Sequence, residues 1–105
     1  MNATLRLPLD EKKLGDFCRK WMISELAVFG SVLRDDFGPE SDVDFLVSFA
    51  QESHWSLFDQ IHMQDELSEI VGRPVDFVTR EGVESSRNYI RRRAILESAQ
   101  VLNVG

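Results

Sequence analysis

The chain has 105 residues, of which 43% are hydrophobic and 29% are charged, so we expect one globular domain over residues 1–105 and exclude a fibrous or wholly disordered protein. Its 12 basic and 18 acidic residues give a net charge of −6, which is the wrong sign for a protein that binds nucleic acid through phosphate contacts. The one cysteine, Cys18, excludes an internal disulfide, and no segment has the apolar length of a transmembrane helix. We therefore expect a cytoplasmic protein with neither membrane nor direct nucleic-acid partners.

The first expected helix begins after Asp10, a residue type that favours the N-cap position. Its apolar residues follow the i, i+3, i+4, i+7 spacing of one helix face: Leu14, Phe17, Cys18 and Trp21. Residues 26–29 form an apolar run too short for a helix, which predicts a buried strand that ends at Gly30 and Ser31. A brief helical turn is expected after them, over residues 32–37.

Two aspartates interrupt the next apolar segment, over residues 41–47. Because side chains alternate between the two faces of a strand, these residues divide into Val43, Phe45 and Val47 on one face and Asp42, Asp44 and Leu46 on the other. After a polar loop over residues 51–56, apolar residues recur along one side of a helix expected over residues 57–71. These are Leu57, Phe58, Ile61, Met63, Leu67, Ile70 and Val71.

Gly72 favours the end of this helix, and a strand is expected over residues 75–79, with Asp76 on the opposite face from its neighbours. The last expected helix covers residues 86–98. We predict that Tyr89, Ile90 and Leu96 face inward and that Arg91, Arg92 and Arg93 face outward. The alternation of helices and strands indicates an α/β or α+β fold, in which helices back a small sheet.

Asp42 and Asp44 are the strongest candidates for a catalytic site. Residues i and i+2 of a strand project from one face about 6.6 Å apart, so the two carboxylates repel each other. A divalent cation would offset this repulsion, and Mg²⁺ prefers one or two carboxylates together with water and substrate phosphates. Asp76 interrupts a second apolar strand and would join the pair if the two strands are neighbours. Two such ions could then assist a phosphoryl transfer.

Gly30 and Ser31 indicate a place for those phosphates. A glycine and a serine between a strand and a helical turn present backbone N–H groups and a hydroxyl to an anion. Arg34, one turn later, would add a guanidinium to the same phosphates, with an ion pair to a nearby carboxylate as the alternative. An Asp-x-Asp pattern alone also fits a solvated strand edge, so the hypothesis depends on these features occurring together.

Three other features have simpler interpretations. Cys18 fits a buried, unreactive thiol on the apolar side of its helix. Trp55 and Phe58 fit the core better than an interface anchor. The chain also has a basic cluster, formed by Arg80, Arg87, Arg91, Arg92 and Arg93. The simpler interpretation is a solvated helix face, and the alternative is a docking surface for an acidic or nucleotide partner.

Gly30-Ser31, followed after residues 32–41 by Asp42-x-Asp44, resembles the nucleotidyltransferase motif of the polymerase-beta-type superfamily. Longer segments are similar to the minimal nucleotidyltransferase (MNT) proteins of that superfamily. These segments cover residues 29–47, 67–78 and 89–96. The resemblance implies a mixed β-sheet with flanking helices that binds a nucleoside triphosphate, such as ATP, together with Mg²⁺.

The resemblance also implies a role for each matching residue. Gly30 and Ser31 would hold the triphosphate. Asp42 and Asp44 would coordinate metal, and Asp76 would act as a base or as a further metal ligand. The chain departs from many relatives in one place, because Asp35 follows Arg34 where those relatives have glycine.

MNT proteins of this size accompany a HEPN-domain protein as its antitoxin. This implies that the chain transfers AMP from ATP to a tyrosine hydroxyl of a HEPN RNase toxin. The sequence agrees in one respect: we expect no second domain to hold an acceptor, so the acceptor must arrive on another molecule. Two alternatives stay open, namely an antitoxin that acts by binding alone and a transferase for a small molecule such as an aminoglycoside.

Overall fold

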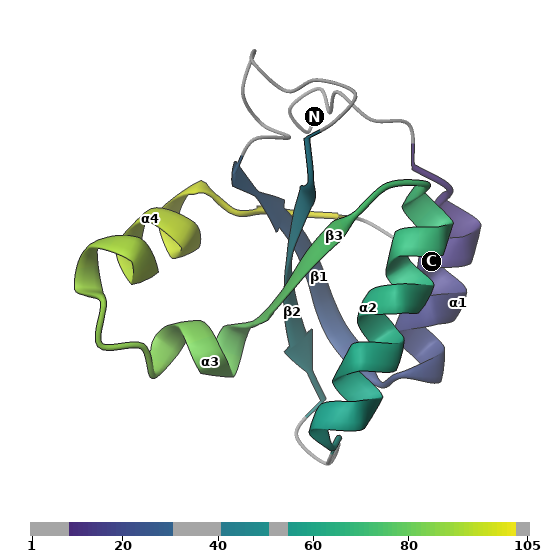
Figure 1. Ribbon diagram of the computed structural model, residues 1–105, viewed down its shortest axis with the longest axis horizontal. Helices are drawn as coiled ribbons and strands as arrows, with labels where there is room; N and C mark the ends of the chain where they lie inside the picture. The colour runs from purple at the N-terminus through teal and green to yellow at the C-terminus, as the bar shows by residue number, and fades with distance from the viewer. Residues whose placement is uncertain (1–8, 31–40, 51–54, 103–105) are drawn as a thin grey trace.

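The computed structural model describes residues 9–30, 41–50 and 55–102 of the chain. Figure 1 shows the helices and strands of these residues, none of the helices being long and apolar enough to cross a membrane. The helices are α1 (Glu11–Lys20), α2 (Leu57–Val71), α3 (Arg80–Glu84) and α4 (Tyr89–Ser98), and the strands are β1 (Ile23–Phe29), β2 (Val43–Phe49), β3 (Val75–Thr79) and β4 (Gln100–Val101). The turn expected over residues 32–37 lies outside the described residues.

The strands of the described residues form one mixed sheet in the order β3-β2-β1-β4. β1 pairs antiparallel with β2 and with β4, whereas β2 and β3 run parallel. A parallel pair needs a crossover connection, and α2 provides it across one face of the sheet (Figure 1). The expected fold, a small mixed sheet flanked by helices, is therefore confirmed.

Helices cover both faces of the sheet, with α1 and α2 on one side and α3 and α4 on the other (Figure 1). The larger core lies under α1 and α2, where Val43, Phe45 and Val47 of β2 are fully enclosed. Leu14 and Met63 reach the same core from the two helices. The opposite face has a smaller core of Ala27, Phe29, Leu46, Val83 and Ile95. The predicted alternation of β2 is thus confirmed.

Caps set the ends of the two helices in the larger layer. Asp10 accepts a hydrogen bond of 3.1 Å from the backbone N–H of Lys13, so it caps α1 as expected. Ser56 and Asp59 form a capping box at the start of α2, and Gly72 ends that helix with a left-handed φ of 77°. The bounds predicted for α2 and β3 agree with the structure because these local signals are strong.

The prediction for the C-terminal part is less accurate. The last helix begins at Tyr89, because Asn88 caps it by accepting a hydrogen bond of 3.0 Å from the backbone N–H of Arg91. Neither α3 nor β4 was expected. Thr79 caps α3 by accepting a hydrogen bond of 3.1 Å from the backbone N–H of Gly82, which is a local signal without an apolar repeat.

The inward orientation expected for several apolar residues is wrong. Tyr89 and Ile90 in the first turn of α4 are 58% and 80% exposed. Phe58 in the first turn of α2 is 77% exposed, because Trp55 fills that end of the core instead. The ring of Trp55 meets that of Trp21 edge-on with centroids 5.2 Å apart, and its Nε1 donates to the Trp21 carbonyl at 2.8 Å. Leu57 and Ile61 of the same helix are also exposed.

Candidate active site

The strand register brings the three predicted carboxylate positions to one end of the sheet. Asp44 of β2 lies beside Asp76 of β3 in the parallel ladder, and on its other side it pairs with Phe29 of β1. Paired positions project from the same face about 4.8 Å apart, and Asp42 lies two residues before Asp44. Asp44 and Asp76 therefore belong to the face that α3 and α4 cover further along, and Asp42 lies directly before β2.

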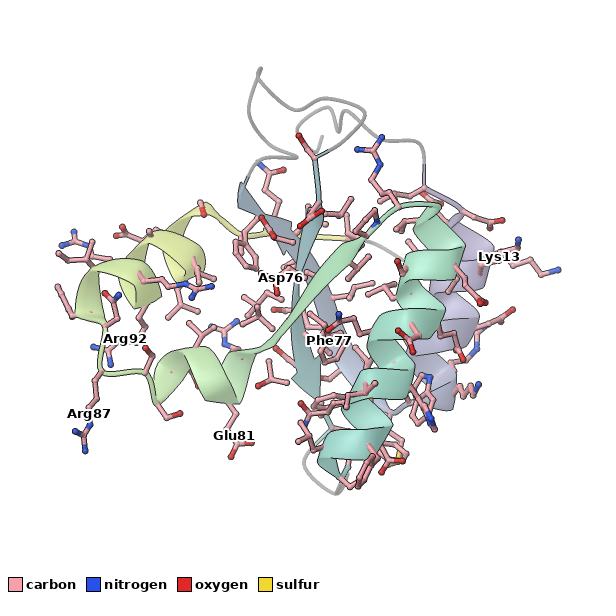
Figure 2. The ribbon with its side chains drawn as sticks, in the orientation of Figure 1. Lys13, Asp76, Phe77, Glu81, Arg87 and Arg92 are labelled. Carbon is pink, nitrogen blue, oxygen red and sulfur yellow. The ribbon has the colours of Figure 1, made fainter. Side chains whose placement is uncertain are left out.

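This face changes from acidic to apolar within one step along the strands. Two residues after the Asp44–Asp76 pair, Leu46 lies beside Val78, and both pack in the smaller core. Asp42 and Asp76 are exposed and Asp44 is half-buried. Figure 2 shows Asp76 between the two helical layers. The acids thus border the α3–α4 layer while they stay accessible to a ligand.

Gly30 follows β1 and lies against the carboxylate of Asp44. Its φ is 75°, in the left-handed region that favours glycine. A Cβ atom added to Gly30 would overlap Oδ2 of Asp44. A larger residue would therefore both strain the backbone and push the carboxylate aside, so glycine is required for the observed approach.

Arg73 ties the starts of β2 and β3 together, a role that the sequence analysis missed. Its Nη1 donates a hydrogen bond of 3.2 Å to the carbonyl of Ser41, the residue before Asp42. The Arg73 carbonyl accepts a hydrogen bond of 2.7 Å from the Ser68 hydroxyl on α2. These bonds fix the backbone just ahead of Asp42 and Asp76. The position of Arg73 in the turn directly before the strand of Asp76 was the feature of the sequence from which this role could have been predicted.

The donor chemistry of the acidic positions fits Mg²⁺, which prefers carboxylate oxygens and shares its coordination with substrate phosphates. Within the described ranges, no three or more His, Cys, Asp or Glu side chains are grouped so that they could hold a metal ion by themselves. Asp42 and Asp44 each have an interaction within the protein already. The arrangement suits an ion that takes one or two protein ligands and completes its shell with substrate and water.

Two residues predicted for the site, Ser31 and Arg34, lie outside the described residues. Cys18 is half-buried against the larger core, and this burial raises the pKa of its thiol, while the nearby Arg19 guanidinium opposes the rise. A raised pKa leaves little reactive thiolate at neutral pH, which agrees with the expected unreactive role.

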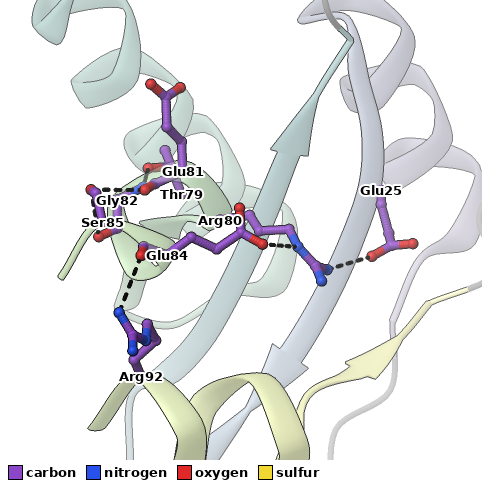
Figure 3. A network of polar contacts seen from close by, with 8 residues as sticks. All are labelled: Glu25, Thr79, Arg80, Glu81, Gly82, Glu84, Ser85 and Arg92. Carbon is purple, nitrogen blue, oxygen red and sulfur yellow. Dashed lines mark hydrogen bonds and ion pairs between the residues drawn. The ribbon is translucent and has the colours of Figure 1, made fainter. Parts of the chain in front are cut away.

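The predicted basic cluster is divided by its contacts. Arg80 pairs with Glu84 at 3.2 Å and with Glu25 at 3.4 Å (Figure 3). Arg92 donates to the carbonyl of Glu84 at 3.4 Å. Arg93 pairs with a carboxylate one turn along its own helix. Arg80 and Arg93 are therefore paired with carboxylates at the surface, whereas Arg92 is held by backbone carbonyls and keeps an unpaired charge among the described residues.

The Nucleotidyltransferase domain family matches residues 11–102 of the chain, which include all the described strands. The chain belongs to this family. The matched range includes Gly30 and the paired positions Asp44 and Asp76.

Curated relatives of this nucleotidyltransferase domain carry the name protein adenylyltransferase. One from Methanocaldococcus jannaschii is 28% identical over 92 residues, which is 88% of this chain and 94% of the relative. Another from the same organism is 29% identical over 66 residues, 63% of this chain and 66% of its own length. MntA of Thermococcus cleftensis is 36% identical over 63 residues, 60% of this chain and 62% of the relative. The matched regions thus cover from about two thirds to nearly all of the length of these relatives.

Solved structures share the fold of this nucleotidyltransferase domain. A minimal nucleotidyltransferase is 29% identical with a TM-score of 0.63, covering 83% of both chains. A toxin–antitoxin structure with AMP-PNP has a TM-score of 0.68 at 17% identity, over 92% of this chain and 75% of the other. A complex of a tri-AMPylated Shewanella oneidensis HEPN toxin with MNT antitoxin has a TM-score of 0.59 at 16% identity, and the match covers 90% of this chain and 70% of the other. At such identities the last two support the fold alone.

Proposed function

We propose that the chain is a Mg²⁺-dependent protein adenylyltransferase that transfers AMP from ATP to a tyrosine hydroxyl of a cognate HEPN-domain toxin, and so acts as its antitoxin. The observation that carries the proposal is the pairing of Asp44 with Asp76, next to the approach of Gly30 to Asp44. The names of the relatives and the AMPylated HEPN toxin in a structure of the same fold support the acceptor class.

We assign metal binding and proton transfer to three carboxylates, and phosphate binding to a separate segment. Asp42 and Asp44 are assigned as ligands of Mg²⁺, two ions in all, with Asp76 as a third ligand or as the base. When bound, Mg²⁺ neutralises the charge of the triphosphate and of the leaving group. The triphosphate is assigned to the segment that begins at Gly30 and continues through Ser31 and Arg34.

The transfer itself is a single displacement at the α-phosphorus of ATP. The tyrosine oxygen forms a new bond to that phosphorus while the bond from phosphorus to the bridging oxygen breaks, and pyrophosphate leaves with the electron pair. Asp76 or water takes the hydroxyl proton. Because Asp76 lies at the exposed edge of the sheet, an acceptor on another molecule can reach it.

The test uses ATP labelled at the α-phosphate, Mg²⁺ and the HEPN-domain protein of the same genome. We expect the label on the HEPN protein, and at least a hundredfold slower transfer by Asp44→Asn, since an amide cannot replace a metal-binding carboxylate. Asp65→Asn is the matched control, because it makes the same change on an exposed part of α2 away from the site. Absence of transfer by the unmodified chain with every nucleotide and metal would contradict the proposal.

An antitoxin that acts by binding alone is distinguished in the same assay. If Asp44→Asn transfers no label yet still suppresses the RNase activity of the HEPN protein, contact and not AMP transfer neutralises the toxin. If suppression is lost while the complex still forms, transfer is the means.

A further inference from the structure

A groove of about 310 Å³ lies between β3 and the α3–α4 layer, and on β3 it is lined by the residues that follow Asp76, from Phe77 to Thr79. Its lining includes Val78 of β3, Val83 of α3 and Ile95 of α4, all of which pack in the smaller core. Val78 follows Asp76 by two residues on the same face, so this lining begins about 6.6 Å along the strand from Asp76. An acceptor segment that extends from the groove past Val78 would therefore reach Asp76.

Positive charge gathers on the α4 side of the groove. Arg91 lines the groove and Arg87 is exposed just before the helix. In the described part of the chain neither of them has an ion-pair partner, unlike Arg80 and Arg93. The first turn of α4 contains no acidic residue, so the positive end of the helix dipole adds to these charges. In a chain whose net charge is −6, this local surface favours an acidic partner.

Exposed apolar side chains adjoin these cations. Ile90 is 80% exposed, and Tyr89 is 58% exposed with the Arg92 guanidinium 5.4 Å from its ring centroid. Apolar and aromatic groups beside arginine are the composition typical of protein–protein contact surfaces. Figure 2 shows Arg87 at the outer edge of the α3–α4 layer and Arg92 between the two helices, both far from Lys13 of α1.

The strand order separates this groove from the proposed phosphate position. Gly30 follows β1, Asp44 lies in the middle strand, and Asp76 lies on the outer strand β3. ATP held at Gly30 would thus approach the carboxylates from one side. The side of β3 and α4 remains for the acceptor, which fits a displacement in which the two reacting oxygens are on opposite sides of the phosphorus.

We propose that the groove between β3 and α4, lined by Arg91, together with the exposed start of α4 at Arg87, Tyr89 and Ile90, docks an acidic segment of the HEPN toxin and directs the acceptor hydroxyl to Asp76. The identity of the partner rests on the proposed function. The charge and the apolar side chains of the surface specify the chemistry of the docked segment: carboxylates flanking at least one apolar side chain.

The experiment measures the affinity of the full chain for the HEPN toxin by calorimetry without ATP. Arg91→Glu should weaken binding at least tenfold, and Ile90→Asp should weaken it by a similar factor. Lys13→Glu is a matched control, because Lys13 and Arg91 both occupy the third position of a ten-residue helix and both donate a backbone N–H to the N-cap side chain. Its affinity should stay within twofold of the unmodified chain.

Loss of fold cannot account for the expected result. A glutamate at the third helical position favours both the helix dipole and a capping interaction, so Arg91→Glu should unfold at or above the temperature of the unmodified chain. Thermal unfolding of all three variants checks this point.

The outcomes separate this inference from the proposed function. Weaker toxin binding by Arg91→Glu without AMP transfer by any form supports the groove and contradicts the transferase. Transfer by the unmodified chain with toxin binding unaffected in both Arg91→Glu and Ile90→Asp overturns the groove. Weaker binding of a fluorescent ATP analogue by Arg91→Glu, with toxin binding intact, also overturns it by assigning the groove to nucleotide. An unmodified chain that binds no HEPN toxin overturns both.

Discussion

Helices α1 and α4 have the same length and the same type of N-terminal cap, yet they differ in every other respect. In α1, Leu14 and Phe17 are buried, with an acidic residue in the first turn and two basic residues in the last. This arrangement complements the helix dipole at both ends. In α4 only Ile95 is buried, and the first turn carries arginine without any acidic residue. The difference indicates that α1 contributes more to the core, whereas α4 leaves the positive charge of its first turn exposed, as the proposed docking surface requires.

Truncation of a buried residue in each helix should have the largest effect, and it tests whether α1 contributes more to stability than α4. Leu14→Ala should lower the free energy of unfolding by about 3 to 5 kcal/mol, because Leu14 is fully enclosed in the larger core. Ile95→Ala should cost about 2 kcal/mol, because the smaller core can relax around the change. Urea denaturation of both variants measures the two values. Equal losses would show that the α3–α4 layer contributes as much as the α1–α2 layer.

Gly30→Ala tests the point at which β1 ends beside the acidic site. The left-handed φ should cost about 1 to 2 kcal/mol of stability. Displacement of the Asp44 carboxylate should slow AMP transfer far more than this loss of stability would predict. Transfer rates measured well below the unfolding temperature separate the two effects. Full activity would show that the approach of Gly30 to Asp44 is not required.

Removal of the N-terminal caps tests whether each helix unfolds with the whole domain or opens by itself. Asp10→Ala should lower the free energy of global unfolding by about 1 kcal/mol, because α1 is joined to the larger core. Asn88→Ala loses a similar cap, yet its effect should appear mainly as faster amide exchange within α4. Hydrogen exchange followed by mass spectrometry distinguishes local opening from global unfolding. Slow exchange in α4 of Asn88→Ala would contradict the assignment of a weakly held helix.

The smallest expected effect concerns the dipole. Arg91→Glu and Lys13→Glu each place a carboxylate in a first turn and should raise stability by roughly 0.3 to 1 kcal/mol at low ionic strength. The gain should be larger for Arg91→Glu, because α1 already has Glu11 in its first turn whereas α4 has no acid there. Thermal unfolding at low salt and at 1 M NaCl checks both values, since salt should remove the difference.

The sequence was sufficient for the part of the fold that local signals specify. α2 and β3 have the predicted bounds because an apolar repeat lies between a polar N-terminal segment and Gly72. β1 begins at Ile23, earlier than predicted, because Ser24 and Glu25 hide the strand pattern. The capped five-residue helix α3 has no apolar repeat from which it could be found.

The candidate site was predictable as a set of residue types, and its geometry was not. The positions of Asp42 and Asp44 follow from strand alternation, but the pairing of Asp44 with Asp76 depends on contacts between segments far apart in the chain. The same limit applies to the bond from Arg73 to the Ser41 carbonyl. The prediction that Ile90 faces inward was also wrong, because an apolar repeat does not show at which residue a helix stops packing against the sheet.

The parallel ladder between β2 and β3 has no hairpin to hold it in alignment, so the crossover through α2 must do so. Side chains on a strand point alternately up and down, and a slip of one residue would turn the Asp76 carboxylate toward α1 and α2, away from Asp44. The pairing of Asp44 with Asp76 therefore depends on the buried residues of β3 and α2 as much as on the aspartates themselves. A substitution that disturbs this packing would move Asp76 away from Asp44 without altering either aspartate.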